Sequence, residues 1–97
     1  MATSTVTFKM KIAEVFRFRD GRTVLVGPID GTSAMLRACT CELLVNGVKR
    51  QEIRIEGEMM PGTAHEQGYR SVSSKDAVQL QPSETATAVC ILQSVAG

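Results

Sequence analysis

Apolar and polar residues alternate along the first part of the chain, which predicts a strand with one buried face. The apolar residues occupy even positions, namely Val6, Phe8, Met10, Ile12, Phe16 and Phe18, and cations occupy the odd positions Lys9, Lys11, Arg17 and Arg19. A period of two is typical of a strand that faces the core on one side and water on the other. Asp20-Gly21 supplies the positive-φ pair that a two-residue turn needs, and Thr23–Val26 resumes as a strand. The pattern therefore predicts a long hairpin whose three phenylalanines all face the core.

Glu14 interrupts this apolar face, and two interpretations follow. An inward Glu14 would need a partner, and its pKa would be open to perturbation. A bulge or bend near Ala13-Glu14 would instead turn the carboxylate outward. We favour the bulge.

Both a helical face and a strand face can be drawn through Met35–Val45. Asn46-Gly47 follows at once, and this dipeptide between two apolar runs is a strong hairpin signal, so we predict a strand. The return strand Val48–Glu56 buries Ile53 and Ile55 on one face. Its other face carries charges of alternating sign, which indicates a solvated surface: Arg50, Glu52, Arg54 and Glu56.

The rest of the chain predicts further short strands and no helix. Residues 57–74 are rich in loop-forming residues, a short strand is expected at 77–80, and a last strand at 85–95 is apolar on both faces. On this last strand, Val89 and Ile91 oppose Cys90 and Leu92, which is typical of a strand covered on both sides. Residues 1–97 therefore predict one all-β domain, a small closed or partly open antiparallel β-barrel of about six strands.

The composition is that of an ordinary globular domain. Apolar residues make up 43%, charged residues 22%, and the net charge is +1, so no global field drives binding to nucleic acid or membrane. No apolar run is long enough to span a bilayer, and no secretory signal is evident, so we expect a cytoplasmic protein. The lack of tryptophan and the single tyrosine argue against an aromatic-lined pocket for a small-molecule substrate.

Residues 8–31, FKMKIAEVFRFRDGRTVLVGPIDG, resemble the start of the β-barrel domain II of translational GTPases of the elongation factor Tu type. Glu14-Val15-Phe16 matches its x-V-F element, and residues 21–29 match its G-x-V-x-x-G-x-V strand. Ile53–Glu56 looks like its inner strand, and Ala64–Gly68 looks like its A-x-x-G element. The resemblance implies a six-stranded barrel of the kind that, in those GTPases, touches RNA and neighbouring domains.

The chain also departs from that pattern. The loop Gly27–Gly31 is one residue shorter than the usual form, Leu36–Cys39 replaces the usual G-D-x-V, and no glycine-rich ending is clear. No G-x-x-x-x-G-K-[ST] loop is present to cradle GTP, so if the barrel interpretation is right we expect the domain without its GTPase. We find no catalytic motif and predict neither an enzyme nor a cofactor.

The cysteines leave a metal site as a minor alternative. Cys39, Cys41 and Cys90 with the only histidine, His65, have the residue types of a Cys3His zinc site. The usual C-x₂₋₄-C spacing is absent, however, and buried free cysteine is a common core residue. We therefore predict three free thiols and no metal, which fits a reducing compartment.

The remaining signal is basic. The candidate nucleic-acid contacts lie on or beside the first hairpin: Lys9, Lys11, Arg17, Arg19 and Arg22. Such cations can hold phosphates, although a merely solvated face is the alternative and the phenylalanines are expected in the wrong phase to stack bases. The prediction is a non-catalytic binding module for RNA or a ribonucleoprotein. A protein–protein interaction or assembly module, using a sheet edge or Met59-Met60, is the second possibility, and a small metal or redox protein the third.

Overall fold

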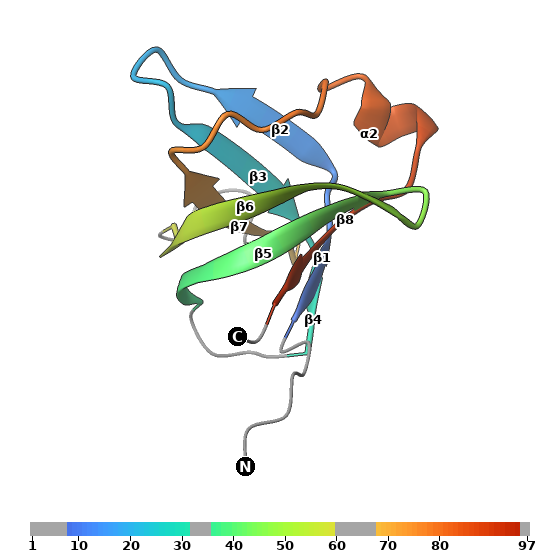
Figure 1. The fold of residues 1–97 in the computed structure, drawn as a ribbon, viewed down its shortest axis with the longest axis horizontal. Coiled ribbons are helices and arrows are strands. Elements are labelled where there is room, and N and C mark those ends of the chain that lie inside the picture. The colour runs from blue at the N-terminus through green and yellow to red at the C-terminus, as the bar shows by residue number, and fades with distance from the viewer. Residues whose placement is uncertain (1–7, 32–35, 60–67, 96–97) are drawn as a thin grey trace.

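The computed structural model describes residues 8–31, 36–59 and 68–95, which form an antiparallel sheet of eight strands (Figure 1). The strands are β1 (Lys9–Lys11), β2 (Glu14–Arg17), β3 (Thr23–Gly27), β4 (Ile29–Asp30), β5 (Arg37–Val45), β6 (Val48–Glu58), β7 (Arg70–Ser74) and β8 (Cys90–Ser94). They lie in the order β2-β3-β7-β6-β5-β8-β1-β4. The all-β prediction is thereby confirmed.

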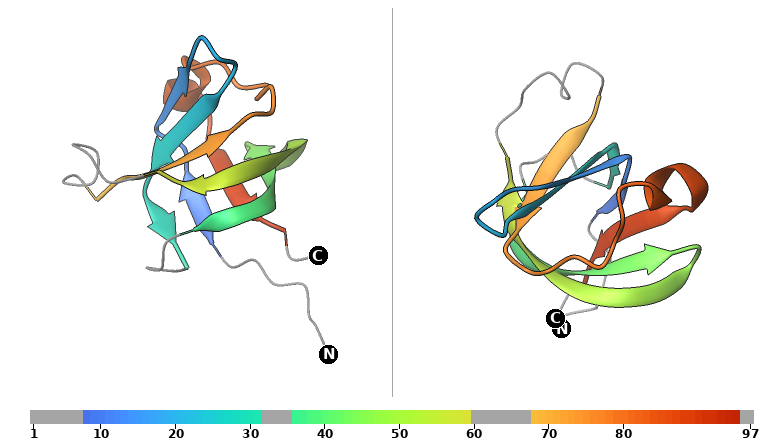
Figure 2. Two further views of the ribbon diagram at one scale, coloured as in Figure 1. Left: turned by 90° about the vertical axis from the view of Figure 1, so that its left-hand side faces the viewer. Right: turned by 90° about the horizontal axis from the view of Figure 1, so that it is seen from above.

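The first hairpin supplies both ends of this order, because each of its long strands is divided in two. Ile12 and Ala13 separate β1 from β2, and Pro28 separates β3 from β4. The Lys11 N–H donates to the Pro28 carbonyl at 3.1 Å and the Ala13 N–H to the Val26 carbonyl at 2.7 Å, so the hairpin stays connected across the break. The sheet therefore curls around its core (Figure 2).

Only the coarse part of the barrel prediction is confirmed, namely a curled antiparallel sheet. Pro28 has no N–H to give to a ladder, and an extra residue at Ala13-Glu14 interrupts the opposite strand. These two breaks raise the number of strands from the predicted six or so to eight. The order runs linearly from β2 to β4, so the described residues form an open curled sheet and not a closed six-stranded barrel.

The second hairpin agrees with its prediction. β5 pairs with β6 from Arg37 to Val45, and the helical alternative for this segment is excluded. Asn46 has a φ of 52° and Gly47 a φ of 83°, so both turn residues are left-handed, as a type I′ turn requires. Ile53 and Ile55 are fully buried.

Buried apolar side chains from most strands meet inside the curl. This core comprises Phe8, Met10, Ile12, Val15, Leu25, Cys41, Leu43, Val45, Ile53, Ile55, Val72, Val78, Leu80, Cys90 and Leu92. The members on β5, β6 and β8 follow the predicted alternation. Their burial removes a continuous apolar surface from water and is the main force holding the sheet together.

The segment after β6 differs most from expectation. β7 lies within residues 57–74, which were predicted to be loop. Residues 77–80, predicted as a strand, are irregular, although Val78 and Leu80 are buried, and residues 84–87 form the short helix α2 (Glu84–Thr87) instead of beginning the last strand. No helix in the described parts of the chain is long and apolar enough to cross a membrane.

Candidate functional site

The buried positions change phase between Ile12 and Val15. Phe8, Met10 and Ile12 are buried, and the next buried residue is Val15. Glu14 is the pairing partner of Val26, whose carbonyl also accepts the Ala13 N–H, so two residues stand opposite one. This is a bulge, and Glu14 points outward and is exposed, as the bulge interpretation predicted.

The same phase change overturns the prediction for two phenylalanines. Phe16 and Phe18 were expected in the core with Phe8, but their side chains are 46% and 47% exposed, whereas Phe8 is 2% exposed. Because side chains alternate along a strand, the single extra residue moves every later side chain of that strand to the other face. The signal was present in the sequence, since a glutamate in an apolar phase is where a bulge is expected.

The hairpin tip beside these rings also differs in detail from the prediction. The Phe18 N–H donates to the Arg22 carbonyl at 2.8 Å, and the Gly21 N–H donates to the Phe18 carbonyl at 3.1 Å. Gly21 has a φ of 91°, and Asp20 is not left-handed. The connection is thus a three-residue loop with Gly21 in the left-handed position, and not the predicted two-residue turn.

Arg17 is held against the body of the protein. Its guanidinium donates to the carbonyls of Val78 and Leu80, both at 2.7 Å. These hydrogen bonds involve an ionised donor and are stronger than neutral ones. Arg17 therefore ties β2 to the irregular segment 77–80, and its donors are used within the chain.

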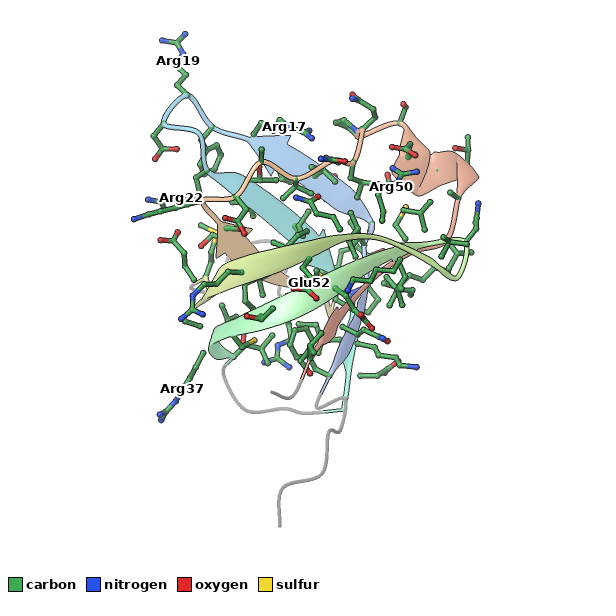
Figure 3. All side chains as sticks on the ribbon, viewed as in Figure 1. Arg17, Arg19, Arg22, Arg37, Arg50 and Glu52 are labelled. Atoms are coloured by element: carbon green, nitrogen blue, oxygen red, sulfur yellow. The ribbon has the colours of Figure 1, made fainter. Side chains whose placement is uncertain are left out.

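Arg22 and Arg19 differ from Arg17 and from each other. Arg22 lies 3.6 Å from Asp20 and 3.7 Å from Glu56, at distances typical of loose ion pairs. Arg19 is exposed at the end of the hairpin and points away from the sheet (Figure 3). It makes no ion pair with any described residue. Arg19 is thus the most available of the three hairpin arginines.

Lys9 and Lys11 lie on another part of the surface. Both are exposed on β1, which pairs with β4 and β8, whereas β2 pairs with β3. Of the five predicted contacts, the structure therefore brings Arg19 and Arg22 to the hairpin tip next to Phe18, with Phe16 two residues further along the chain on β2. Arg17 is used in hydrogen bonds within the chain. Lys9 and Lys11 lie on β1, away from the hairpin tip.

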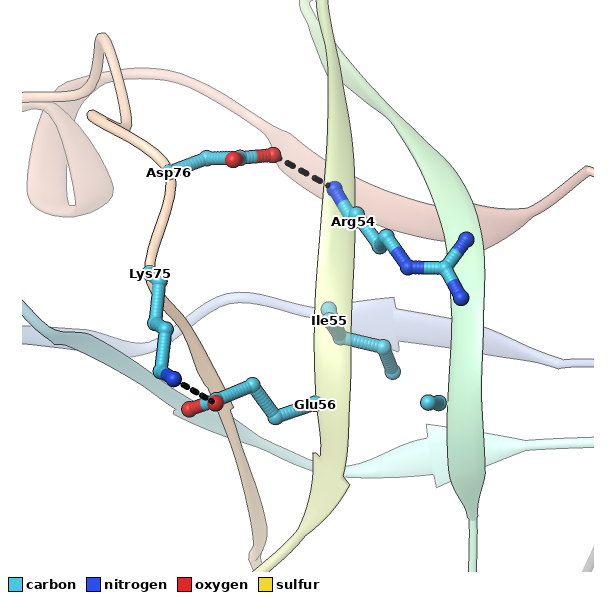
Figure 4. Close-up of a pocket in the computed structure, with 6 residues that line it drawn as sticks. Arg54, Ile55, Glu56, Lys75 and Asp76 are labelled. Carbon is cyan, nitrogen blue, oxygen red and sulfur yellow. Dashed lines mark hydrogen bonds and ion pairs between the residues drawn. The ribbon is translucent and has the colours of Figure 1, made fainter.

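A shallow hollow of about 340 Å³ lies elsewhere, between β6 and the residues that follow β7 (Figure 4). Its lining residues are Ala38, Arg54, Ile55, Glu56, Lys75 and Asp76. The Lys75 ammonium lies 3.5 Å from a Glu56 oxygen, and a carboxylate oxygen of Asp76 accepts the backbone N–H of Arg54 at 2.8 Å. Two cations and two anions balance here, so the hollow offers no strong field for a charged ligand.

The cysteines do not assemble into the alternative zinc site within the described residues. Cys39 and Cys41 have their sulfur atoms 3.8 Å apart, and none of the three cysteines is in a disulfide. Cys90 pairs with Val45, four residues along β5 from Cys41, and His65 lies outside the described residues. No group of three or more His, Cys, Asp or Glu side chains is placed to hold a metal in ranges 8–31, 36–59 and 68–95.

Burial also makes the inner thiols unreactive. Burial raises the pKa of Cys41 far above its ordinary value, and the neighbouring Cys39 raises it further. Burial likewise raises the pKa of Cys90, with the negative charge of Glu84 as the second cause. A protonated, buried thiol is a poor nucleophile and a poor metal ligand. These two cysteines therefore act as core residues.

No family model, curated protein or solved structure matches the chain. The resemblance to domain II of translational GTPases therefore stays a prediction from the residues quoted above.

Proposed function

We propose that the protein is a non-catalytic binding module that holds single-stranded RNA at the tip of the β2–β3 hairpin. The observation that carries this proposal is the exposure of Phe16 and Phe18. The chain has three phenylalanines and no tryptophan, and two of those three are half-exposed, one on β2 and one directly after it. Rings exposed to water lack the stabilisation that burial gives, and a ligand that covers them would supply it.

The spacing of the two rings suits bases. Phe16 lies on β2 and Phe18 directly follows its last residue, Arg17, so two residues of extended chain would place their Cα atoms about 6.8 Å apart. Unpaired bases stack on aromatic rings with little regard to sequence. Two rings at this spacing can therefore receive two bases of a flexible single strand.

The cations complete the surface. Arg19 is exposed beside Phe18, and Arg22 holds its carboxylate partners only loosely, at 3.6 and 3.7 Å. Cations placed beside stacking rings neutralise phosphates and make binding salt-dependent. Contacts to phosphates and to the faces of bases carry no sequence information, so the binding is expected to be weak and indifferent to sequence.

A titration of a labelled, unstructured RNA by fluorescence anisotropy tests this function. Phe16→Ala and Phe18→Ala should each weaken binding roughly five- to 150-fold, the range that stacking on one ring is worth. Replacing Arg19 and Arg22 together should lower the slope of log K against log salt by about 1.4 for two phosphate contacts. Val48→Ala is the matched control, because Val48 is an even more exposed apolar residue, 69% exposed, and begins β6 directly after the other hairpin turn.

Two results would count against this function. One is the absence of RNA binding by the intact chain. The other is an affinity that the double variant Phe16→Ala/Phe18→Ala leaves unchanged, since the rings would then take no part.

A protein ligand is the second candidate, because β2 is a sheet edge. β2 stands at the end of the strand order and pairs only with β3 among the described strands. A hollow of about 310 Å³ runs along it, lined by Ala13, Glu14, Val15, Phe16, Pro82 and Thr85. An exposed edge can receive an extended peptide as an additional strand. A partner that co-purifies with the tagged chain after nuclease treatment, and is lost with Phe16→Ala, would favour this candidate over RNA.

A further inference from the structure

β8 is apolar on both faces, yet only one face is fully covered. Cys90 and Leu92 are buried in the core, whereas Val89, just before the strand, is 51% exposed and Val95, just after it, is 37% exposed. Ile91 lies between them on the same outward side and is half-buried. The sequence predicted a strand covered on both sides, so the outer side lacks the cover that its composition calls for.

The neighbouring strands extend this apolar surface. Ile91 pairs with Leu44 on β5 and with Lys11 on β1, so the three side chains form one row across three adjacent strands. In the next row, Gln93 pairs with Glu42 on β5 and with Lys9 on β1. We call this surface the outer β8 face; it comprises Val89, Ile91, Gln93, Val95, Leu44, Glu42, Lys9 and Lys11.

In the row that holds Gln93, the two flanks of the outer β8 face carry opposite charge, with Lys9 on β1 and Glu42 on β5. On the β1 flank, Lys9 and Lys11 make no ion pair with any described residue, although Asp30 is the pairing partner of Lys9. On the β5 flank, the single ammonium of Lys49 lies 3.8 Å from Glu42 and 2.9 Å from Glu52. In this row two carboxylates thus share one cation, and Glu42 also accepts a hydrogen bond from the Gln93 side-chain amide at 2.6 Å. The next cation on this flank, Arg54, stands one row further along, opposite Thr40.

This arrangement is complementary to itself. A two-fold axis parallel to β8, midway between two facing sheets, exchanges the left and right flanks of the opposing copy. It therefore places Lys9 of each copy over Glu42 of the other, and Ile91 over Ile91 at the centre. An interface of this kind uses the same patch on both subunits, as two-fold dimers do. An axis perpendicular to β8 would instead set the lysines against each other.

We propose that the outer β8 face binds a second copy of this chain, with the β8 strands of the two copies parallel and Lys9 opposite Glu42 across the interface. The apolar residues at the centre supply the attraction, since burying them removes apolar surface from water. The charges on the flanks fix the orientation, which is the usual contribution of charge complementarity at an interface. The RNA surface proposed at the β2–β3 hairpin lies on other strands and takes no part in this contact.

Sedimentation equilibrium over a wide range of chain concentration tests the proposal. The intact chain should dimerise, and Lys9→Glu should weaken the dimer about tenfold, because each substitution acts twice in a two-fold interface. Glu42→Lys should weaken it similarly, and the double variant Lys9→Glu/Glu42→Lys should restore it, since the pair is then reversed. Arg19→Glu is the matched control, because it makes the same charge change at the hairpin tip.

A second pair of variants tests the apolar centre. Val89→Asp should abolish the dimer, whereas Val48→Asp, an exposed valine outside the outer β8 face, should leave it intact. Circular dichroism of each variant separates loss of the dimer from loss of the fold. A chain that stays monomeric overturns the proposal, as does a dimer that Lys9→Glu leaves unchanged or that the double variant fails to restore.

Discussion

Arg17 illustrates at the residue scale how a charge that the sequence assigns to solvent can hold the fold together. Its guanidinium donates two hydrogen bonds at 2.7 Å to carbonyls of the irregular segment that fills one part of the core. Those carbonyls belong to Val78 and Leu80, whose side chains are buried. A buried segment outside regular structure must find partners for its backbone groups, and Arg17 supplies two of them.

We therefore expect Arg17→Ala to lower the free energy of unfolding by about 1–2 kcal/mol, the size expected for losing hydrogen bonds from a charged donor in a partly exposed setting. Arg19→Ala at the exposed hairpin tip should change it by no more than about 0.5 kcal/mol. Urea unfolding followed by circular dichroism measures both. Equal stability of the two variants would show that the Arg17 contacts contribute nothing.

At the element scale, the first hairpin is shaped by a bulge on one strand and a close approach on the other. Gly27 ends β3 one residue beyond Val26, which stands opposite the bulge, and it is buried. A Cβ placed on Gly27 would overlap the carbonyl oxygen of Lys11, which is backbone and has little room to move. The close approach of the two strands at this point therefore requires glycine.

Gly27→Ala should accordingly lower the free energy of unfolding by about 1–3 kcal/mol, the cost of forcing extra atoms into a packed site. Gly21→Ala is the control: a Cβ there meets nothing within 4 Å and costs only the strain of a positive φ, about 1 kcal/mol or less. Thermal and urea unfolding of both variants give the comparison. If Gly27→Ala proves as stable as the intact protein, the strands do not approach this closely.

At the scale of the whole molecule, residues 77–84, which follow β7, are hydrogen-bonded to β6. Gln51 donates to the Ala77 carbonyl at 2.6 Å, and the Gln79 N–H donates to the Gln51 side-chain oxygen at 2.8 Å. Arg50 reaches α2, where its guanidinium lies 2.9 Å from Glu84 (Figure 3). β6 thereby holds both the irregular segment and the short helix.

The ion pair between Arg50 and Glu84 should weaken in acid. The hydrogen bond from Arg50 holds the pKa of Glu84 below its ordinary value, and the backbone N–H of Gln81 lowers it further. A carboxylate whose pKa is depressed by folding stabilises the protein above its unfolded pKa, and that contribution is lost as pH falls through the folded pKa. Glu52 behaves in the same way, because Lys49 lowers its pKa.

Glu84→Gln should therefore be less stable than the intact chain near neutral pH, and the difference should shrink as the pH falls through the depressed pKa of Glu84, where its carboxylate becomes protonated. Urea midpoints measured across this range for the two proteins provide the test. A difference that persists unchanged in acid would mean that the Glu84 charge is not the cause.

How far the sequence predicts this molecule depends on the range of the forces involved. The turn at Asn46-Gly47 and the burial of Ile53 and Ile55 follow from local rules, namely the φ that a residue tolerates and the period of its neighbours. β7 and α2 were missed because their sequences carry little such signal. Residues 77–80 alternate like a strand, but their backbone is satisfied by Arg17 and Gln51 instead of by a ladder.

The candidate site shows the same division. Periodicity and turn chemistry act locally, so the sequence alone predicts a mostly antiparallel β fold, the position of the second hairpin turn, and the residues of β5, β6 and β8 that face the core. The tertiary structure sets the direction in which Phe16 and Phe18 point, because one extra residue at Ala13-Glu14 reverses every later side chain of its strand. It also decided that Arg17 serves the fold while Arg19 faces water, since two like charges in one pattern differ only by the neighbours that folding brings to them.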